Sequence, residues 1–397
     1  MKKETMHAPK GFLFSTAEAA IKKPGRKDLA LIYSEKEAVI SGMFTTNKVK
    51  AAPVKLDMKR SRAGKGQAII VNSGNANACT GEQGMKDAVE MTDLVAKYLK
   101  LKPGTVYVCS TGVIGTPMPM ERIRPKIAGL AQGLGKSDIH SVSTAIMTTD
   151  TFPKIVSKRV MIAGKAVTIS GLCKGAGMIC PNMATMLCFI MTDAHIDKAA
   201  LDASLKHAVQ KSLNRITVDG DMSTNDTVLV MANGIAGNQL ITEKSASYKT
   251  FAATIDNICY ELSKLIVSDG EGATKLIEIT IKNARSEGEA EKGAFAIANP
   301  LLVKTAIYGN DSNWGRIMCA LGYSGITIKE DKIDVNINGL KTVSKGLGTG
   351  KDNEANEKLK NKEVHIVIDL HLGKGAAKVL TCDLTEDYVK INAEYRT

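Results

Sequence analysis

Short apolar segments alternate with longer helical patterns along most of the chain. Residues 67–71 form a largely apolar run that predicts a buried strand, and residues 72–81 continue as a loop of small and polar residues. Apolar positions then recur at helical spacing between Met85 and Leu99. This alternation of strand and helix patterns is typical of a mixed α/β fold.

The second half of the chain continues the same alternation. Apolar residues at helical spacing predict helices over residues 196–213 and 248–266. Alternating apolar and polar residues predict strands at 276–281, 333–337 and 364–370. No segment recurs with the period of a solenoid, so the chain is not a repeat protein.

The composition is that of an ordinary globular protein. Hydrophobic residues make up 44% and charged residues 24%, and no apolar run approaches the roughly 18 residues of a membrane-spanning helix. The first residues, Met1 to Phe12, include basic side chains but no apolar stretch like that of a secretory signal. We therefore expect a cytoplasmic protein with no membrane partner.

The cysteines and histidines lack the spacing of a metal site. The chain has 8 cysteines and 6 histidines, with no Cys-x-x-Cys pair and no His-Glu-x-x-His motif. Several cysteines lie within apolar runs, which favours reduced core cysteines over a disulfide or zinc framework. The sequence therefore predicts no metal site.

The net charge of +12 suggests nucleic-acid binding as one alternative. Such binding needs a basic stripe or stacking aromatic residues, but Lys and Arg are spread along the chain and aromatic residues make up only 4%. We favour a basic solvated surface that helps to steer an anionic small substrate, and we expect no nucleic-acid partner. A non-catalytic basic binding protein stays the alternative from a different class.

The stretch from Lys174 to Met191 contains the strongest candidate for chemistry. A loop punctuated by glycine and proline leads into an apolar strand that is expected to begin at Thr185. If the Ala184–Thr185 bond were cut, the new α-amine of Thr185 would lie beside its own hydroxyl and act as its general base. A threonine at the start of a strand is also an ordinary β-former, so the pattern alone leaves both interpretations open.

Several motifs follow the order found in one known family. The runs Lys174-Gly-Ala-Gly-Met178 and Pro181-Asn-Met-Ala-Thr-Met-Leu187 closely resemble the self-processing site of the ornithine acetyltransferase (glutamate N-acetyltransferase) family. The other motifs that resemble this family are Asn72-Ser-Gly-Asn-Ala-Asn-Ala78, Cys109-Ser-Thr-Gly-Val-Ile-Gly115, Met147-Thr-Thr-Asp150, Asp219-Gly-Asp221, Ser268-Asp-Gly-Glu-Gly-Ala273 and Asn310-Asp-Ser-Asn-Trp-Gly-Arg316. Essentially the whole chain is covered by the resemblance.

The resemblance implies an acyltransferase of arginine biosynthesis. Its small-molecule substrates would be N2-acetyl-L-ornithine and L-glutamate, and its products L-ornithine and N-acetyl-L-glutamate. The precursor would cut itself between Ala184 and Thr185, and acetyl transfer would be ping-pong through acetyl-Thr185. The cut pieces would assemble as two α plus two β chains, without a cofactor or metal.

The fold that the resemblance implies is α/β, of the self-processing N-terminal-nucleophile type. Stacked β-sheets would be sandwiched between helical layers, with a smaller mixed C-terminal α/β region. We expect a main catalytic domain over residues 1–195, which includes the cleavage site, an α/β middle region over 196–282 and a C-terminal α/β region over 283–397 that closes the substrate site.

The resemblance also implies roles for single residues. Thr111 and Gly112 would form the oxyanion hole, for which a hydroxyl and a backbone N–H are suitable donors, although the pair alone also reads as a simple turn. Lys174 would bind a substrate carboxylate and Glu271 the ornithine ammonium, although either is by itself an ordinary surface charge. The full set of expected substrate-binding residues is Thr148, Lys174, Thr185, Glu271, Asn392 and Thr397.

Two alternatives stay open within the enzyme class. A bifunctional enzyme would also take acetyl from acetyl-CoA and so act as an N-acetylglutamate synthase. A related self-cleaving aminopeptidase would use water as the acceptor. The sequence does not separate the first alternative from the transferase, so acetyl-CoA stays open as a co-substrate.

The segment 219–226 has no assigned role. It begins like a calcium-binding loop, but Thr224 stands where the sharp-turn glycine belongs and Val230 where the bidentate glutamate belongs. Met222 also replaces the threonine that the family resemblance would place there. The sequence therefore leaves the function of this segment undetermined.

Overall fold

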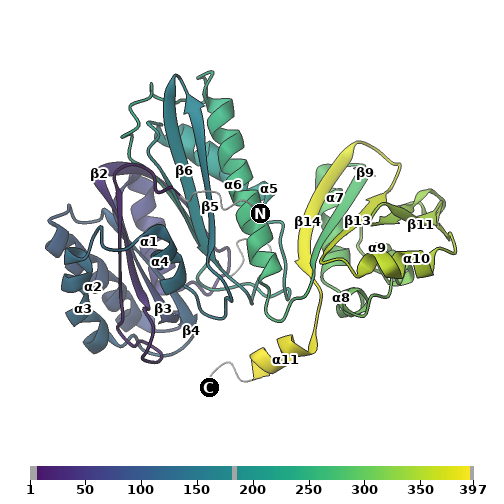
Figure 1. Cartoon of the computed structure of the whole chain (residues 1–397), viewed down its shortest axis with the longest axis horizontal. Helices are drawn as coiled ribbons and strands as arrows, with labels where there is room; N and C mark the ends of the chain where they lie inside the picture. The colour runs from purple at the N-terminus through teal and green to yellow at the C-terminus, as the bar shows by residue number, and fades with distance from the viewer. Residues whose placement is uncertain (1–6, 181–185, 394–397) are drawn as a thin grey trace. The chain divides into compact units, whose positions relative to one another are not determined.

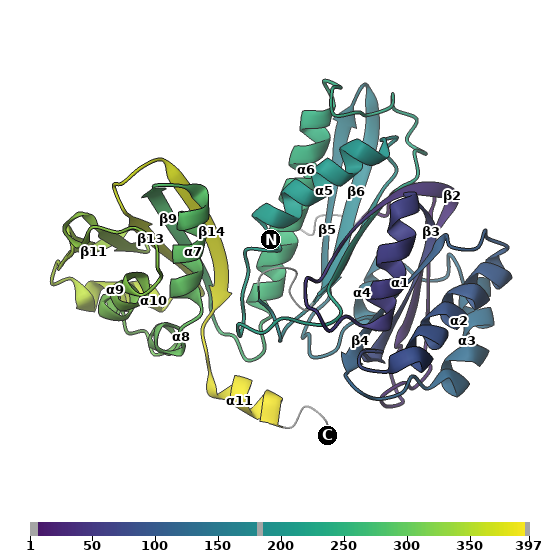
Figure 2. The ribbon, with the colours of Figure 1, turned by 180° about the vertical axis from the view of Figure 1, so that it is seen from behind.

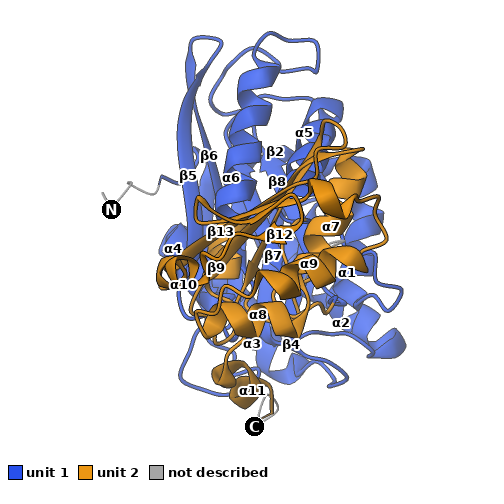
Figure 3. Cartoon of the chain, turned by 90° about the vertical axis from the view of Figure 1, so that its right-hand side faces the viewer, with its two compact units in different colours: residues 1–175, 182–214, 222–262 blue, residues 176–181, 215–221, 263–397 orange. Residues whose placement is uncertain are grey.

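The computed structural model describes residues 7–180 and 186–393. The chain forms two compact units, coloured separately in Figure 3. Unit 1 comprises Met1–Gly175, Asn182–Asn214 and Met222–Leu262, and unit 2 comprises Ala176–Pro181, Arg215–Asp221 and Ser263–Thr397. Among the described residues, no helix has the length and apolarity needed to cross a membrane.

Unit 1 is built on an eight-stranded sheet with the order β4-β3-β2-β8-β7-β6-β5, and β1 pairs with β2 outside this path. The strands are β1 (Phe12–Ala17), β2 (Leu29–Phe44), β3 (Lys65–Asn75), β4 (Val106–Val113), β5 (Lys154–Ile162), β6 (Lys165–Lys174), β7 (Leu187–Thr192) and β8 (Thr227–Ala232). The pairs β3–β4 and β7–β8 are parallel. The apolar run predicted as a buried strand at 67–71 lies within β3, which confirms that prediction.

Helices lie on both faces of this sheet. They are α1 (Ala52–Arg60), α2 (Gly81–Leu99), α3 (Met120–Gln132), α4 (Ile139–Ala145), α5 (Lys198–Lys211) and α6 (Tyr248–Ser268), with a short 3-10 turn η1 (Ser61–Ala63). The last residues of α6, from Ser263, belong to unit 2. Successive residues of β3 point to opposite faces. Ile70 therefore packs with Met91 of α2, whereas Ile69 packs with Val142 of α4. Figure 1 and, from behind, Figure 2 show α2 beside α3 on one flank of the unit.

Local signals in the sequence explain where individual helices begin and how closely they pack. Asp197 caps α5 by accepting a hydrogen bond from the backbone N–H of Ala200, as an aspartate at this position commonly does. Gly171 of β6 lies under α6, and a Cβ atom there would come within 2.8 Å of Leu262. The glycine thus lets α6 pack close to the sheet.

Unit 2 contains a six-stranded sheet with the order β12-β11-β10-β13-β9-β14. Its strands are β9 (Leu276–Ala284), β10 (Asp334–Ile337), β11 (Leu340–Ser344), β12 (Leu347–Gly348), β13 (Glu363–Asp369) and β14 (Gly375–Cys382). Its helices are α7 (Glu287–Ala298), α8 (Leu301–Tyr308), α9 (Trp314–Gly322), α10 (Asp352–Leu359) and α11 (Glu386–Ala393), with a 3-10 turn η2 (Glu330–Lys332). The strands predicted at 276–281, 333–337 and 364–370 correspond to β9, β10 and β13.

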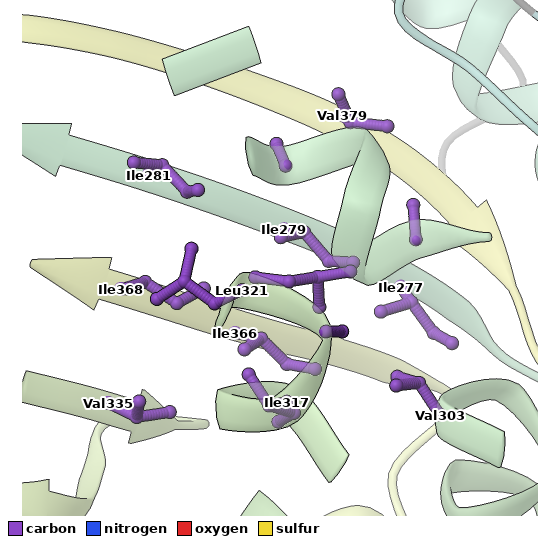
Figure 4. Packing of buried hydrophobic residues seen from close by; sticks show 14 of the residues in the cluster. Ile277, Ile279, Ile281, Val303, Ile317, Leu321, Val335, Ile366, Ile368 and Val379 are labelled. Atoms are coloured by element: carbon purple, nitrogen blue, oxygen red, sulfur yellow. The ribbon is translucent and has the colours of Figure 1, made fainter. Parts of the chain in front are cut away.

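The core of unit 2 lies against one face of this sheet (Figure 4). Ile279 and Ile281 of β9 lie next to Ile366 and Ile368 of β13, because these two strands pair in parallel. Leu321 of α9 packs onto the same cluster. The alternating pattern of the sequence therefore buries its apolar positions together, as a sheet with one covered face requires.

The predicted α/β fold class is confirmed, and so is a smaller mixed α/β region at the C-terminal end. The two units differ, however, from the three predicted regions 1–195, 196–282 and 283–397. The reason lies in β8, which is inserted between β2 and β7 of the large sheet. Most of the segment from 196 to 262 therefore belongs to unit 1 and is not a region of its own.

Replacing Ile279 by alanine tests the core of unit 2. The side chain is fully buried, so Ile279→Ala should lower the free energy of unfolding by about 2–5 kcal/mol, measured by urea denaturation. Leu301→Ala is the control, because Leu301 is 66% exposed and its truncation should change stability by no more than about 0.5 kcal/mol. Equal effects of the two substitutions would contradict this description of the core.

Candidate active site

A buried lysine at the end of β6 brings together three of the predicted site residues. The Lys174 side chain is 4% exposed, and its Nζ donates a hydrogen bond to Thr148 Oγ1 at 2.6 Å. The same Nζ lies 3.4 Å from Thr111 Oγ1, to which it also donates. Lys174, Thr148 and Thr111 thus form one polar group within unit 1.

Asp150 supplies the negative charge that this group needs. Its Oδ1 accepts hydrogen bonds from Lys154 Nζ and from the backbone N–H of Gly175, both at 2.7 Å, and its Oδ2 lies 3.7 Å from Lys174 Nζ. The backbone N–H of Thr148 donates to the same Oδ2 at 3.0 Å. Asp150 therefore ties both lysines and the turn that carries Thr148 into one cluster.

The charges around Asp150 determine whether its carboxyl group is protonated. Burial by itself raises the pKa of the Asp150 carboxyl, but the ammonium groups of Lys174 and Lys154 outweigh it and hold that pKa well below its usual value. The carboxylate is therefore ionised at neutral pH.

Thr111 and Gly112 lie at the end of β4. Gly112 has a φ of +136°, and a Cβ atom there would lie 2.2 Å from the carbonyl carbon of Gly74, its partner in β3. Only glycine fits this backbone without displacing the neighbouring strand. Since Lys174 has donors only, the Thr111 oxygen accepts its hydrogen bond, and the Thr111 hydroxyl hydrogen remains available to another acceptor.

Buried amides fix the strand ends around Thr111. Ser110 Oγ donates to Asn72 Oδ1 at 2.6 Å, which joins β4 to β3. Asn225 Nδ2 donates to the carbonyl oxygens of Ala76 and Ser110 at 2.6 and 2.8 Å. The asparagine-rich motif that begins at Asn72 thus acts as a support for the strand end, a role that its residue types alone do not reveal.

A second group of predicted residues lies in unit 2. Asn392 Nδ2 on α11 donates to Glu271 Oε2 at 2.8 Å, and the Glu271 N–H donates to the carbonyl oxygen of Ala176 at 2.9 Å. A Cβ atom at Gly177 would come within 2.3 Å of Glu271 Oε2. A glycine at 177 therefore makes room for the Glu271 carboxylate, which explains one small residue of the Lys-Gly-Ala-Gly motif.

Asp219 and Tyr388 extend this second group, and neither is a site residue predicted from the sequence. Asp219 accepts hydrogen bonds from the backbone N–H groups of Met178 and Ile179 at 2.6 and 2.8 Å. The Tyr388 hydroxyl donates to Asp219 Oδ2 at 3.3 Å. Burial raises the pKa of Asp219, and burial together with the Asp219 charge raises the pKa of Tyr388. The Asp-Gly-Asp motif could have identified Asp219 as a site residue, whereas no motif in the sequence marks Tyr388.

Three of the predicted site residues, Ala184, Thr185 and Thr397, lie outside the described residues. The description resumes at Met186, one residue before β7 begins at Leu187. Within the residues that the structure describes, no three His, Cys, Asp or Glu side chains gather as a metal site would require.

Comparison with known proteins gives the family. Residues 13–397 match the ArgJ family. The arginine biosynthesis bifunctional protein ArgJ of Geobacter sulfurreducens is 54% identical over 390 residues, which cover 98% of this chain and 99% of that protein. The protein of the same name from Caldanaerobacter subterraneus is 50% identical over 394 residues, with 98% of each chain covered. The chain therefore belongs to the ArgJ family.

Two solved structures are also similar. The crystal structure of the arginine biosynthesis bifunctional protein ArgJ from Bacillus halodurans is 46% identical with a TM-score of 0.51, and the match covers 52% of this chain and 97% of that chain. The ornithine acetyltransferase of Mycobacterium tuberculosis, complexed with ornithine, is 36% identical with a TM-score of 0.41, and the match covers 44% of this chain and 93% of that one.

Asp150→Asn tests the charge cluster. The substitution removes the negative charge that Asp150 places beside two buried ammonium groups, so it should cost about 3–5 kcal/mol of unfolding free energy at pH 7. Because the folded pKa of Asp150 is lowered, its contribution is complete above the unfolded pKa of about 3.9 and is lost as the pH falls towards the folded value. The difference between wild type and variant, measured by urea unfolding, should therefore shrink below about pH 4.

Glu357→Gln is the control for this measurement. Glu357 forms an ion pair with Lys360 in which both side chains are more than half exposed, so its removal should change stability by less than about 1 kcal/mol. An Asp150→Asn variant as stable as wild type at pH 7 would contradict a buried ionised carboxylate.

Proposed function

We propose that this chain is a glutamate N-acetyltransferase that moves the acetyl group of N2-acetyl-L-ornithine to L-glutamate through acetyl-Thr185. The observation that carries the proposal is the ArgJ family match over residues 13–397. The buried group of Lys174, Thr148 and Thr111 supports it, because Lys174 ends the strand that leads into the segment containing Thr185.

The first proposed step is self-cleavage between Ala184 and Thr185. The Thr185 hydroxyl oxygen attacks the Ala184 carbonyl carbon, the C–N bond breaks, and the nitrogen takes up the proton that the hydroxyl loses. Water then hydrolyses the resulting ester, which gives a carboxylate at Ala184 and a free α-amine and hydroxyl at Thr185. The Bacillus halodurans chain supports this step, because 97% of it corresponds to only 52% of the present chain.

Acetyl transfer then uses the two new groups of Thr185. The α-amine, with a reference pKa of about 7.7–8.0, removes the hydroxyl proton as the oxygen attacks the acetyl carbonyl of acetylornithine. The proton passes to the departing nitrogen of ornithine. The glutamate amine then attacks the acetyl-Thr185 ester, and the Thr185 oxygen recovers a proton as N-acetylglutamate leaves.

Thr111 and Gly112 are the proposed oxyanion donors. The hydroxyl hydrogen of Thr111 is available because its oxygen accepts from Lys174, and a positive charge 3.4 Å behind that oxygen makes the hydroxyl a better donor. The Gly112 N–H is the second donor. Loss of one such donor typically costs a factor of about 10²–10³ in turnover.

The substrate contacts are proposed as two groups. Lys174, with Thr148 beside it, binds the α-carboxylate that both substrates carry. Glu271, oriented by Asn392, binds the ornithine ammonium. Thr397 is the remaining proposed contact.

We also propose a cofactor requirement, a subunit assembly and a location in the cell for this enzyme. The reaction needs no cofactor and no metal. The two pieces assemble as two α plus two β chains, and the enzyme acts in the cytoplasm.

A second candidate function is a bifunctional enzyme that also uses acetyl-CoA. The relatives that are about half identical over nearly their whole length are named bifunctional, which favours this candidate. To test this bifunctional candidate, acetyl-CoA is supplied as the only acetyl donor and N-acetylglutamate formation is measured by mass spectrometry. Product at a rate of at least about a hundredth of that with acetylornithine, well above the rate without enzyme, would establish the second donor. Release of acetate without glutamate would instead indicate a hydrolase.

Thr185→Ala tests both cleavage and catalysis. Wild type should give two fragments that meet between Ala184 and Thr185 on a denaturing gel and by intact mass, whereas the variant should give one uncut chain without transferase activity. Thr305→Ala is the control, because Thr305 lies on the exposed side of α8 and should leave cleavage unchanged. An uncut wild-type chain that still transfers acetyl would contradict the mechanism.

A further inference from the structure

Asp226, the last residue of the segment 219–226, lies directly before β8 and is fully buried. Its Oδ1 accepts a hydrogen bond from the backbone N–H of Met186 at 2.9 Å. The next residue, Thr227, donates its N–H to the carbonyl oxygen of Met186 at 3.1 Å. Met186 is thus held on both of its backbone polar groups by two consecutive residues.

The Met186 N–H belongs to the peptide group whose carbonyl is that of Thr185. A peptide group is planar, so a hydrogen bond to its N–H restrains the peptide group as a whole. Asp226 therefore contacts the peptide group on the carboxyl side of Thr185, on the opposite side of Thr185 from the bond that is cut.

The carboxyl of Asp226 is costly for the fold. Among the described residues its Oδ2 has no hydrogen-bond partner, and burial raises its pKa, opposed by the Met186 N–H, by Thr45 and by the Lys174 charge. A buried polar atom without a partner calls for an explanation other than stability. Asp226 Oδ1 satisfies the Met186 N–H, whereas a stabilising role does not explain Oδ2, so the position of this carboxyl next to Met186 points to a function.

Asp219, at the other end of the same segment, supplies a second contact of the same kind within unit 2. It accepts from the backbone N–H groups of Met178 and Ile179, which precede the cleavage site as Met186 follows it. In unit 2 Asp219 thus accepts from residues that precede the cleavage site in the sequence, and in unit 1 Asp226 accepts from a residue that follows it.

We propose that Asp226 is the positioning residue for Thr185: by accepting from the Met186 N–H, it restrains the residue that directly follows Thr185, and both self-cleavage and acetyl transfer depend on that restraint. This inference rests on the proposed function, because it assumes that Thr185 is the nucleophile. A displacement of about 1 Å in a reacting group costs a factor of about 10² in rate, so loss of the contact should be visible in both steps.

The test compares the full-length variants Asp226→Ala and Asp193→Ala. Asp193 is also fully buried and accepts a backbone N–H, from Thr168 at 2.8 Å, but it follows β7 whereas Asp226 contacts the residue before β7. Both substitutions remove a buried acceptor and should destabilise the chain to a similar extent. Only Asp226→Ala should slow the appearance of the two fragments, by a factor of about 10–100, followed by denaturing gel and intact mass.

A kinetic readout separates positioning from a general loss of structure. The cleaved fraction of Asp226→Ala, collected after long incubation, should show kcat for acetyl transfer lowered by at least about tenfold, with KM for acetylornithine within about threefold of wild type. Asp193→Ala should keep both constants, and thermal unfolding should show both variants folded at the assay temperature.

If Asp226→Ala does not fold, Asp226→Glu tests the positioning role in its place. It keeps the carboxyl but moves it by one methylene group, so a positioning role predicts a folded chain that cleaves at least about tenfold more slowly. Folded Asp226 variants that cleave and turn over at the wild-type rate would overturn the inference while leaving the proposed function intact. A wild-type chain that is never cut would instead overturn the proposed function.

Discussion

The pairing of one buried carboxylate with two buried lysines is the interaction on which the rest of unit 1's polar site depends. Asp150 lowers the cost of keeping Lys174 charged in the protein interior, where an unpaired ammonium would lose its proton or open the fold. A charged Lys174 then orients the hydroxyls of Thr111 and Thr148, since it offers hydrogen-bond donors only. Removal of the carboxylate would therefore alter charge, hydroxyl orientation and backbone position together.

Local patterns predicted much of the fold. Alternation at 276–281 gave β9, and the apolar run at 67–71 gave β3, because burial on one or both faces of a sheet leaves a direct mark on the sequence. The domain bounds could not be predicted in the same way. The insertion of β8 between β2 and β7 depends on pairing between segments far apart in sequence, which no local window contains.

The candidate site, like the fold, could be predicted from the sequence only where a local motif marks the residue. Lys174, Thr111, Thr148, Glu271 and Asn392 were named from motifs, and the structure brings the first three together in unit 1 and the last two together in unit 2. Lys154 and Tyr388 escaped notice because a lysine in a strand and a tyrosine in a terminal helix carry no local signal, and their meaning comes from partners distant along the chain. The role of Thr185 stays a prediction.

The order of strands in the large sheet has a consequence for the lifetime of a processed enzyme. A cut between Ala184 and Thr185 would place β6 on one polypeptide and β7 on the other, yet these strands are hydrogen-bonded neighbours, and β8 on the second polypeptide is likewise bonded to β2 on the first. The two polypeptides would share a single sheet and its core. Their dissociation would therefore amount to unfolding, so the severed halves should behave as one cooperative body that is inherited from the precursor and not reassembled from free parts.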